Sequence, residues 1–250
     1  MTNKNEIVNF SDIRLSPRRP APVYLLLDTS GSMAGEKINE LNAGFAGLIS
    51  NCKKEDNQEI ELVFTVITFG GGVHIPIDNM ALKEINIPTF SASGDTPMGA
   101  ALELVAGKLD EFYAKNAQSY RPIIVLFSDG EPTDMPSGLQ KCEDRKMFWE
   151  KWISLQKFHA HRRVARATRL ACAFGQNANK EMLVAFANAD EKTHFQVLMA
   201  SDAAGIAKFF KYVTASIATH TTSTDSEDWS QMAPLKELYF LKKNQCLPRN

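Results

Sequence analysis

Runs of consecutive apolar residues alternate along the chain with segments whose apolar positions recur every three or four residues. Two of the runs are uninterrupted, at residues 23–27 (VYLLL) and 123–127 (IIVLF). A strand with one solvated face would alternate apolar and polar positions, so these runs predict strands buried on both faces, as in a parallel sheet. The first run ends directly in Asp28, and the second is followed by Ser128 and Asp129.

Helices and further strands are predicted around these two strands. Segments with an apolar face of helical period lie at 36–52, 97–113, 146–163, 180–187 and 203–218. Further strands are predicted at 60–69, 73–77, 167–174 and 194–198, and the glycines at 70–72 predict a hairpin whose second strand lies at an edge. The alternation indicates an α/β fold with a doubly wound, mostly parallel central sheet, one antiparallel edge strand and helices on both faces.

Length and composition favour one globular domain with short appendages. The 250 residues, 44% of them hydrophobic, are enough for one sizeable core. The 28 basic and 29 acidic residues nearly cancel, which argues against nucleic acid or an anionic membrane as the main partner. Residues 1–20 lack a signal-peptide core, and no run approaches the roughly 20 apolar residues of a membrane span, so a cytoplasmic protein is expected.

The ends of the chain lie outside the alternation of strands and helices. We expect an N-terminal arm at 1–20, one domain at 21–218 and a C-terminal tail at 219–250. The polar segment 221–228 (TTSTDSED) is typical of disorder, and its Ser and Thr residues are alternatively candidate targets of a kinase. A separate hypothesis is that residues 235–241 (LKELYFL) form a short amphipathic helix that docks on the domain or on a neighbour.

A cluster of short oxygen-bearing side chains follows the first apolar strand. Asp28, Ser30 and Ser32 form a D-x-S-x-S loop at the carboxyl end of that strand, where functional groups gather in doubly wound sheets. Such a loop is also a plausible helix-capping turn without any metal. As a ligand set, however, oxygens without nitrogen or sulfur suit a hard cation such as Mg²⁺ and disfavour zinc and copper.

The D-x-S-G-S loop resembles the metal-ion-dependent adhesion site of the von Willebrand factor A (VWA), or integrin I-like, family. That family places a Thr before a helix, matched by Thr96 in residues 93–102 (SGDTPMGAAL), and an Asp-Gly after the fourth strand, matched by Asp129 and Gly130. The resemblance covers about residues 20–218 and implies the Rossmann-like VWA fold. It also implies Mg²⁺, with Mn²⁺ or Ca²⁺ as alternatives, on five ligands: Asp28, Ser30, Ser32, Thr96 and Asp129.

The same resemblance implies a function without catalysis. The module would bind a partner protein by taking the partner's Asp or Glu as the missing metal ligand. The form of the three motifs looks like the bacterial TerY-type proteins of tellurite-resistance and stress clusters. That likeness implies a stress-response or phospho-signalling system, with a PP2C-like phosphatase and a Ser/Thr-kinase-like protein as partners.

Three alternatives stand beside this interpretation, and one of them is an inert scaffold whose site is only structural. A metal-dependent phosphotransfer enzyme could use Asp28 as nucleophile, but Ser30 stands where haloacid-dehalogenase-type phosphatases carry a second Asp. A zinc site could draw on His159 and His161, with Cys142 and Cys172, but residues two apart on a helix face different ways. Reduced thiols are expected for these cysteines and for Cys52 and Cys246.

Four further residues near the motifs have an interpretation of their own. Asp95 is expected to be a turn or cap residue, and Asp134 is expected to close the Pro-Thr-Asp turn. Met33 and Met98 either rim the site with adaptable apolar contacts or are buried.

Overall fold

Six strands and five helices make up the described part of the chain. The computed structural model describes residues 18–55, 60–129, 131–136, 151–175, 178–187 and 197–222. The strands are β1 (Arg19–Asp28), β2 (Ile60–Phe69), β3 (Val73–Ala81), β4 (Ile123–Ser128), β5 (Thr168–Phe174) and β6 (Val197–Ala200). The helices are α1 (Glu36–Lys54), α2 (Met98–Lys115), α4 (Ile153–Ala160), α5 (Lys180–Ala187) and α6 (Ala203–Thr222), and short 3₁₀ turns lie at Gly31–Met33, Leu82–Glu84 and Val164–Arg166.

The strands form one sheet in the order β3-β2-β1-β4-β5-β6. Every neighbouring pair is parallel except β2 and β3, which are antiparallel. This arrangement confirms the predicted α/β fold with one antiparallel edge strand. From β1 the chain moves to one side of the sheet for β2 and later to the other side for β4, so the order of winding reverses between β1 and β4. Ligand sites of open α/β sheets lie at the carboxyl ends of strands at such a point.

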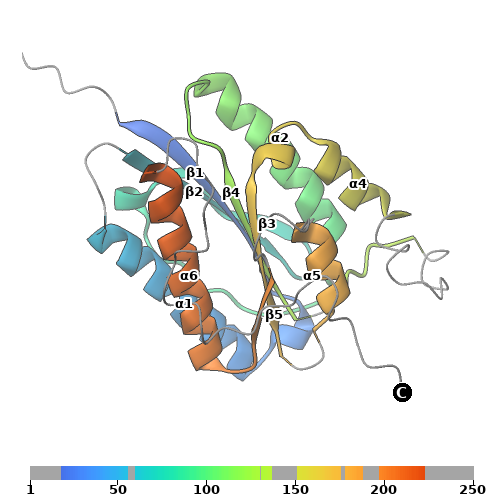
Figure 1. Ribbon diagram of the computed structural model, residues 1–250. Coiled ribbons are helices and arrows are strands. Elements are labelled where there is room, and N and C mark those ends of the chain that lie inside the picture. The colour runs from blue at the N-terminus through green and yellow to red at the C-terminus, as the bar shows by residue number, and fades with distance from the viewer. Residues whose placement is uncertain are drawn as a thin grey trace, which may run out of the picture.

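Helices cover both faces of the sheet (Figure 1). On one face, α1 and α6 pack over a core that includes Val23, Leu25 and Leu27 of β1. On the other face, α2, α4 and α5 pack over a second core that includes Tyr24 and Leu26. Successive side chains of β1 thus enter opposite cores, and all five are at most 1% exposed. The uninterrupted apolar run follows from this burial on both faces.

The structure shifts several predicted bounds. β1 begins at Arg19 and α6 continues to Thr222, so the ends of these elements lie within the expected arm and tail. β3 continues past the predicted residue 77 to Ala81, because a bulge at Asn79 (φ 46°) is held by a 3.2 Å hydrogen bond from its N–H to Thr65 Oγ1.

The predicted helix at 146–163 is shorter than expected in its described part. Trp152 has an extended backbone, and α4 begins after it, at Ile153. The extended conformation places the Trp152 ring in the core beside α2, where a Cβ on Gly99 would lie 2.9 Å from the ring. His161 is extended as well and ends the helix. Residues 146–150 of this prediction, and 194–196 of the predicted last strand, lie outside the described residues, whereas that strand continues to Ala200.

Helices α1 and α6 approach each other closely at Gly44. A Cβ at this position would lie 2.6 Å from Ile206 Cγ2 and 2.6 Å from Phe210 Cδ2. Gly47, one turn further along α1, has no such neighbour within 4 Å. The two glycines therefore have different roles in one helix: Gly44 permits contact between helices, while Gly47 lowers helix propensity without taking part in that contact.

We predict opposite stability effects of alanine at these two positions. Gly44→Ala should destabilise the protein by about 1–3 kcal/mol, because the added methyl overpacks the contact with α6. Gly47→Ala should stabilise it by about 0.5–1 kcal/mol through helix propensity alone. Urea unfolding followed by circular dichroism measures both changes. Equal effects of the two substitutions would contradict the described packing of α1 on α6.

Candidate metal centre

Asp28 lies at the end of β1 with its carboxylate fully buried. The backbone N–H of Ser30 donates to Asp28 Oδ1 over 2.9 Å, and the hydroxyl of Ser128 donates to Oδ2 over 2.6 Å. Ser128 ends β4, which pairs with β1 in parallel register up to Leu27 and Phe127. Strand pairing therefore places a hydroxyl donor beside the carboxylate, and the tight turn after β1 adds a backbone donor.

A chain of hydroxyls links the turn after β1 to Asp129. The Ser32 hydroxyl donates to Asp129 Oδ1 over 2.7 Å, and the Ser30 and Ser32 hydroxyl oxygens are 3.0 Å apart. Because Ser32 uses its one proton on the carboxylate, Ser30 must donate to Ser32. The two serines of the D-x-S-x-S motif thus lie in one hydrogen-bonded row that ends on the carboxylate of Asp129.

Lys37 supplies a positive charge to this site. Its ammonium group forms an ion pair with Asp129 Oδ2. The Asp129 side chain is 1% exposed, whereas that of Lys37 is 38% exposed and lies over the Phe174 ring with 6.0 Å between Nζ and the ring centroid. A buried carboxylate requires a partner, and here a partly solvated lysine in the first turn of α1 provides it. The sequence analysis missed this residue.

Backbone hydrogen bonds join the Asp28 loop to the loop that carries Thr96. The N–H of Gly31 donates to the carbonyl of Gly94 over 2.9 Å, and the N–H of Ser93 donates to the carbonyl of Thr29 over 2.8 Å. Thr96 itself is 6% exposed. Main-chain hydrogen bonds at Ser93 and Gly94 therefore hold the loop that carries Thr96 beside the D-x-S-x-S loop.

The segment after Asp129 holds the other side of the Thr96 loop. Thr133 and Thr96 bond twice, from Thr96 N–H to Thr133 Oγ1 and from Thr133 N–H to the Thr96 carbonyl, each over 2.9 Å. Asp134 accepts hydrogen bonds from the N–H groups of Gly99 (3.1 Å) and Ala100 (2.9 Å), so its carboxylate caps the start of α2 from a distant loop. The Pro-Thr-Asp turn was the available signal for this role.

Glycines allow these loops to touch. Gly94 has φ +67°, and a Cβ there would overlap Gly71 Cα and lie 2.8 Å from Gly71 N. A Cβ on Gly70 would overlap the carbonyl of Thr29. The turn after β1, the turn between β2 and β3 and the loop that carries Thr96 therefore pack backbone against backbone.

The electrostatics of the site favour an added cation. Burial raises the pKa of Asp28, hydrogen bonds from Ser128 and Ser30 oppose this effect, and the charge of Asp129 raises the pKa further. Of the two buried carboxylates, Asp129 is paired with the ammonium group of Lys37. Carboxylate and hydroxyl oxygens are donors for hard divalent cations, so the residues present fit such an ion.

The structure accounts for the remaining predicted site residues. Asp28, Ser30, Ser32 and Asp129 belong to one hydrogen-bonded cluster, and Thr96 lies in the loop joined to it. Asp95 is exposed, and its carbonyl accepts a hydrogen bond from Gly71 N–H over 3.0 Å. Met33 and Met98, which the sequence placed either at the rim of the site or in the core, are fully buried.

The histidines of the alternative zinc site have other partners. His159 Nε2 lies 2.9 Å from the Ala185 carbonyl and its Nδ1 lies 2.7 Å from the Arg169 guanidinium, so the ring is neutral and both nitrogens are used. Burial, together with Arg169, lowers the pKa of His159 to about 4. His161 contacts Asp110 at 3.1 Å. Within the described residues no three His, Cys, Asp or Glu side chains form a metal cluster, while Cys142 and Cys246 lie outside them.

Comparison with known proteins agrees with this architecture. The family model for the von Willebrand factor type A domain matches residues 23–211. The von Willebrand factor domain of a type V pili tip protein from Porphyromonas gingivalis aligns with a TM-score of 0.59 and 9% identity, covering 86% of this chain and 100% of that one. At this identity the likeness concerns the fold.

Two further solved structures were described with a metal. Proximal thread matrix protein 1 from the mussel byssus, with a zinc-occupied metal-ion-dependent adhesion site, aligns with a TM-score of 0.52 and 16% identity over 80% of this chain and 48% of that one. Manganese-loaded TRAP protein from Plasmodium vivax aligns with a TM-score of 0.53 and 19% identity, over 78% and 74% of the two chains. The match spans about half the length of the mussel protein.

Gly94 and Gly71 give a matched test of the loop packing. Both have positive φ, but a Cβ on Gly71 would meet its neighbours at ordinary distances of 3.5 Å or more. Gly71→Ala should therefore cost only the backbone strain of about 1–2 kcal/mol. Gly94→Ala should cost more, by about 1–3 kcal/mol of overpacking. Thermal and urea unfolding measure the difference, and a Gly94→Ala protein as stable as Gly71→Ala would contradict the contact.

Proposed function

The chain belongs to the von Willebrand factor type A family, and we propose that it is a metal-dependent protein-interaction module without catalytic activity. Domains of this family are typically adhesion or interaction modules that use a bound metal. The observation that carries the proposal is the hydrogen-bonded cluster of two buried carboxylates and two hydroxyls at the point where the sheet order reverses.

We propose that one divalent cation binds between the loops that follow β1 and β4 and the loop that carries Thr96. Its protein ligands are the five predicted oxygen-bearing residues: Asp28, Ser30, Ser32, Thr96 and Asp129. A hydroxyl that donates its proton to a carboxylate keeps oxygen lone pairs for a metal. Ser32 donates to Asp129 in this way. Mg²⁺ is the proposed ion, with Mn²⁺ or Ca²⁺ as alternatives. The manganese-loaded and zinc-occupied structures of other family members support a divalent ion and leave its identity to measurement.

The proposed partner group is a carboxylate. When bound, the cation supplies positive charge and a coordination position for one further oxygen. Ser32 is exposed while Asp28 and Ser30 are buried, so the hydroxyl row runs from the interior to the surface at this end of the sheet. The buried residues orient the site, and the exposed end leaves room for an Asp or Glu side chain of another protein.

Lys37 is proposed as an internal competitor for the cation. Its ammonium group neutralises Asp129 when the second carboxylate lacks a metal. Because the side chain is partly exposed, it can move toward solvent. Metal binding would then replace the single positive charge of Lys37 beside Asp129 with the two positive charges of the cation.

The cellular system in which the chain acts, and its partners there, are also proposals. The forms of the three motifs support a bacterial TerY-type protein of a cytoplasmic stress-response or phospho-signalling system connected with tellurite resistance. A PP2C-like phosphatase and a Ser/Thr-kinase-like protein are the proposed partners. No helix among the described residues is both long and apolar enough to cross a membrane.

The geometry does not favour the alternative phosphotransfer enzyme. A nucleophilic carboxylate must reach its substrate, whereas Asp28 is fully buried and both of its oxygens accept hydrogen bonds. Its surroundings suit a fixed ligand whose orientation is held by neighbours. Phosphatase turnover by the purified protein that disappears in Asp28→Asn would contradict the proposal of a non-catalytic module.

Removal of the competing charge should tighten metal binding. We expect Lys37→Met to bind Mg²⁺ or Mn²⁺ about tenfold more tightly, the order expected for one partly solvent-screened unit charge beside a ligand. Isothermal titration calorimetry measures the affinity directly. Lys115→Met, at the far end of α2, makes the same change in net charge and should leave the affinity unchanged. Equal or weaker binding by Lys37→Met would refute the competitor role.

Partner capture should depend on the metal centre. The wild-type protein, used as bait in an extract of its native host, should retain a partner in Mg²⁺ and release it in chelator. The Asp28→Ala/Ser30→Ala protein should retain none under either condition, because the buried ligands are missing. Circular dichroism and unfolding establish that the variant is folded. Capture that persists in chelator and in the variant would defeat the proposal.

A further inference from the structure

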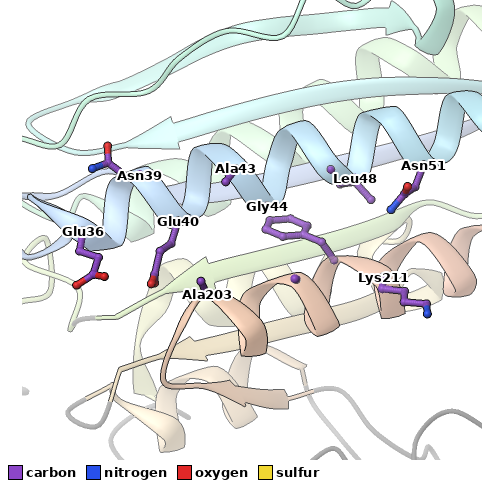
Figure 2. A pocket seen from close by; sticks show the side chains of 12 residues that line it. Glu36, Asn39, Glu40, Ala43, Gly44, Leu48, Asn51, Ala203 and Lys211 are labelled. Atoms are coloured by element: carbon purple, nitrogen blue, oxygen red, sulfur yellow. The ribbon is translucent and has the colours of Figure 1, made fainter.

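A groove separate from the metal centre runs between α1 and α6. Its volume is about 580 Å³, and Figure 2 shows side chains of both helices along it. Small residues, among them Ala43, Gly47 and Ala207, form part of its walls, while Leu48 and Phe210 form the floor. The close contact at Gly44 joins the helices, and the absence of any atom within 4 Å of a Cβ on Gly47 leaves the groove open beside it.

The groove has opposite charges along its length. Glu36 and Glu40 lie at the end where both helices begin, near Ala203, and Lys211 lies further along α6 (Figure 2). Partial burial and the neighbouring charge of Glu36 raise the pKa of Glu40, as expected where acidic groups gather. Lys54 ends α1 beyond the opposite end of the groove, while the preceding Lys53 donates to the Ile85 carbonyl. The order along the groove is therefore acidic, apolar and basic.

The chain after α6 carries the complementary order. Residues 223–250 begin with an acidic segment at 225–228 (DSED), continue with an apolar segment at 235–241 (LKELYFL) and end with basic residues. These are Lys242, Lys243 and Arg249. If this segment returns antiparallel to α6, its acidic part faces the lysines, its apolar part faces the alanine and glycine walls, and its basic part faces Glu40 and Glu36.

The length of the segment permits this return. Helix α6 contains 20 residues and ends at Thr222, which corresponds to about 30 Å. The 13 residues from Thr222 to Leu235 extend to about 40 Å, which is enough to lead the apolar segment back to the level of Phe210. A segment on the same chain also has a high effective concentration for the groove, so modest contacts are sufficient.

We propose that residues 235–243 of this chain dock in the groove between α1 and α6, antiparallel to α6, with Lys242 and Lys243 beside Glu40 and Glu36. The apolar residues of 235–241 cover the alanine and glycine walls. This interaction concerns a surface away from the metal ligands and does not depend on the proposed function. It gives the C-terminal tail a defined place on the domain.

Disulfide mapping in the full-length chain tests both the contact and its direction. In this geometry Cys246 lies near Asn39 at the acidic end and away from Asn51, which is 12 residues further along α1. Each position is changed to Cys in a Cys142→Ser background. Buried Cys52 and Cys172 stay unreactive, since burial raises the pKa of both thiols.

We expect the intramolecular disulfide of Asn39→Cys with Cys246 to form about tenfold faster than that of Asn51→Cys, because docking holds the tail thiol at one end instead of letting it sample both. Peptide mass spectrometry after oxidation with glutathione disulfide measures both rates. Equal rates would show a tail that is merely tethered and would overturn the proposal. Concentration-dependent dimers in place of the intramolecular product would assign the groove to a second copy and would overturn it as well.

Two matched glycine substitutions separate the groove from general effects on folding. Gly47→Phe fills the groove, and Gly107→Phe places the same side chain on α2, where a Cβ also meets no atom within 4 Å. Both substitutions should preserve the fold, since phenylalanine has higher helix propensity than glycine. Gly47→Phe should slow the Asn39→Cys disulfide to the Asn51→Cys rate, and Gly107→Phe should not. A rate unchanged by Gly47→Phe in a folded protein would refute docking in this groove.

Discussion

The burial of two carboxylates at the ends of adjacent strands is the constraint on which the rest of the site depends. Asp28 ends β1 and Asp129 follows β4, and both side chains are almost fully removed from solvent. Such charges are costly unless hydrogen-bonded and paired. The donors around them are therefore necessary: a backbone N–H, the hydroxyls of Ser128 and Ser32, and the ammonium group of Lys37. Two buried carboxylates in one site favour the binding of a cation.

The parallel sheet and the loop backbones hold these groups in position. Adjacent parallel strands deliver the two carboxylates to the same edge, since β1 and β4 pair without a register shift. The Thr96 loop is fixed from both sides, by Gly94 accepting from Gly31 and by Thr133 bonding to Thr96. Glycines at the contact points let main chains meet where a Cβ would overlap its neighbour. The position of the site is thus set by the backbone, and its side chains contribute the oxygens.

Sequence patterns predicted the parts of this arrangement that have a local cause. The apolar runs at 23–27 and 123–127 mark strands buried on both faces, and the polar residues at their ends mark the site. Lys37 carried no comparable signal, because it acts on a residue more than 30 positions away, and the Pro-Thr-Asp turn marked Asp134 but not the helix α2 that it caps. The ion pair between Lys37 and Asp129 joins two distant parts of the chain, so no periodic sequence pattern marks it. The shorter helix after Trp152 escaped prediction for the same reason: the ring packs against Gly99 of α2, a contact made only in the folded chain.

Helix α1 connects the metal centre with the groove because its first turn faces both. Lys37 points to Asp129, while Glu36 and Glu40 line the groove beside α6. The turn begins after Gly35, whose φ of +82° places the chain in a conformation that glycine adopts without strain. The charges of opposite sign in this turn therefore serve different surfaces. The lysine balances a buried carboxylate, and the glutamates leave an acidic end on a groove whose other end is basic, so one helix start sets the electrostatics of both sites.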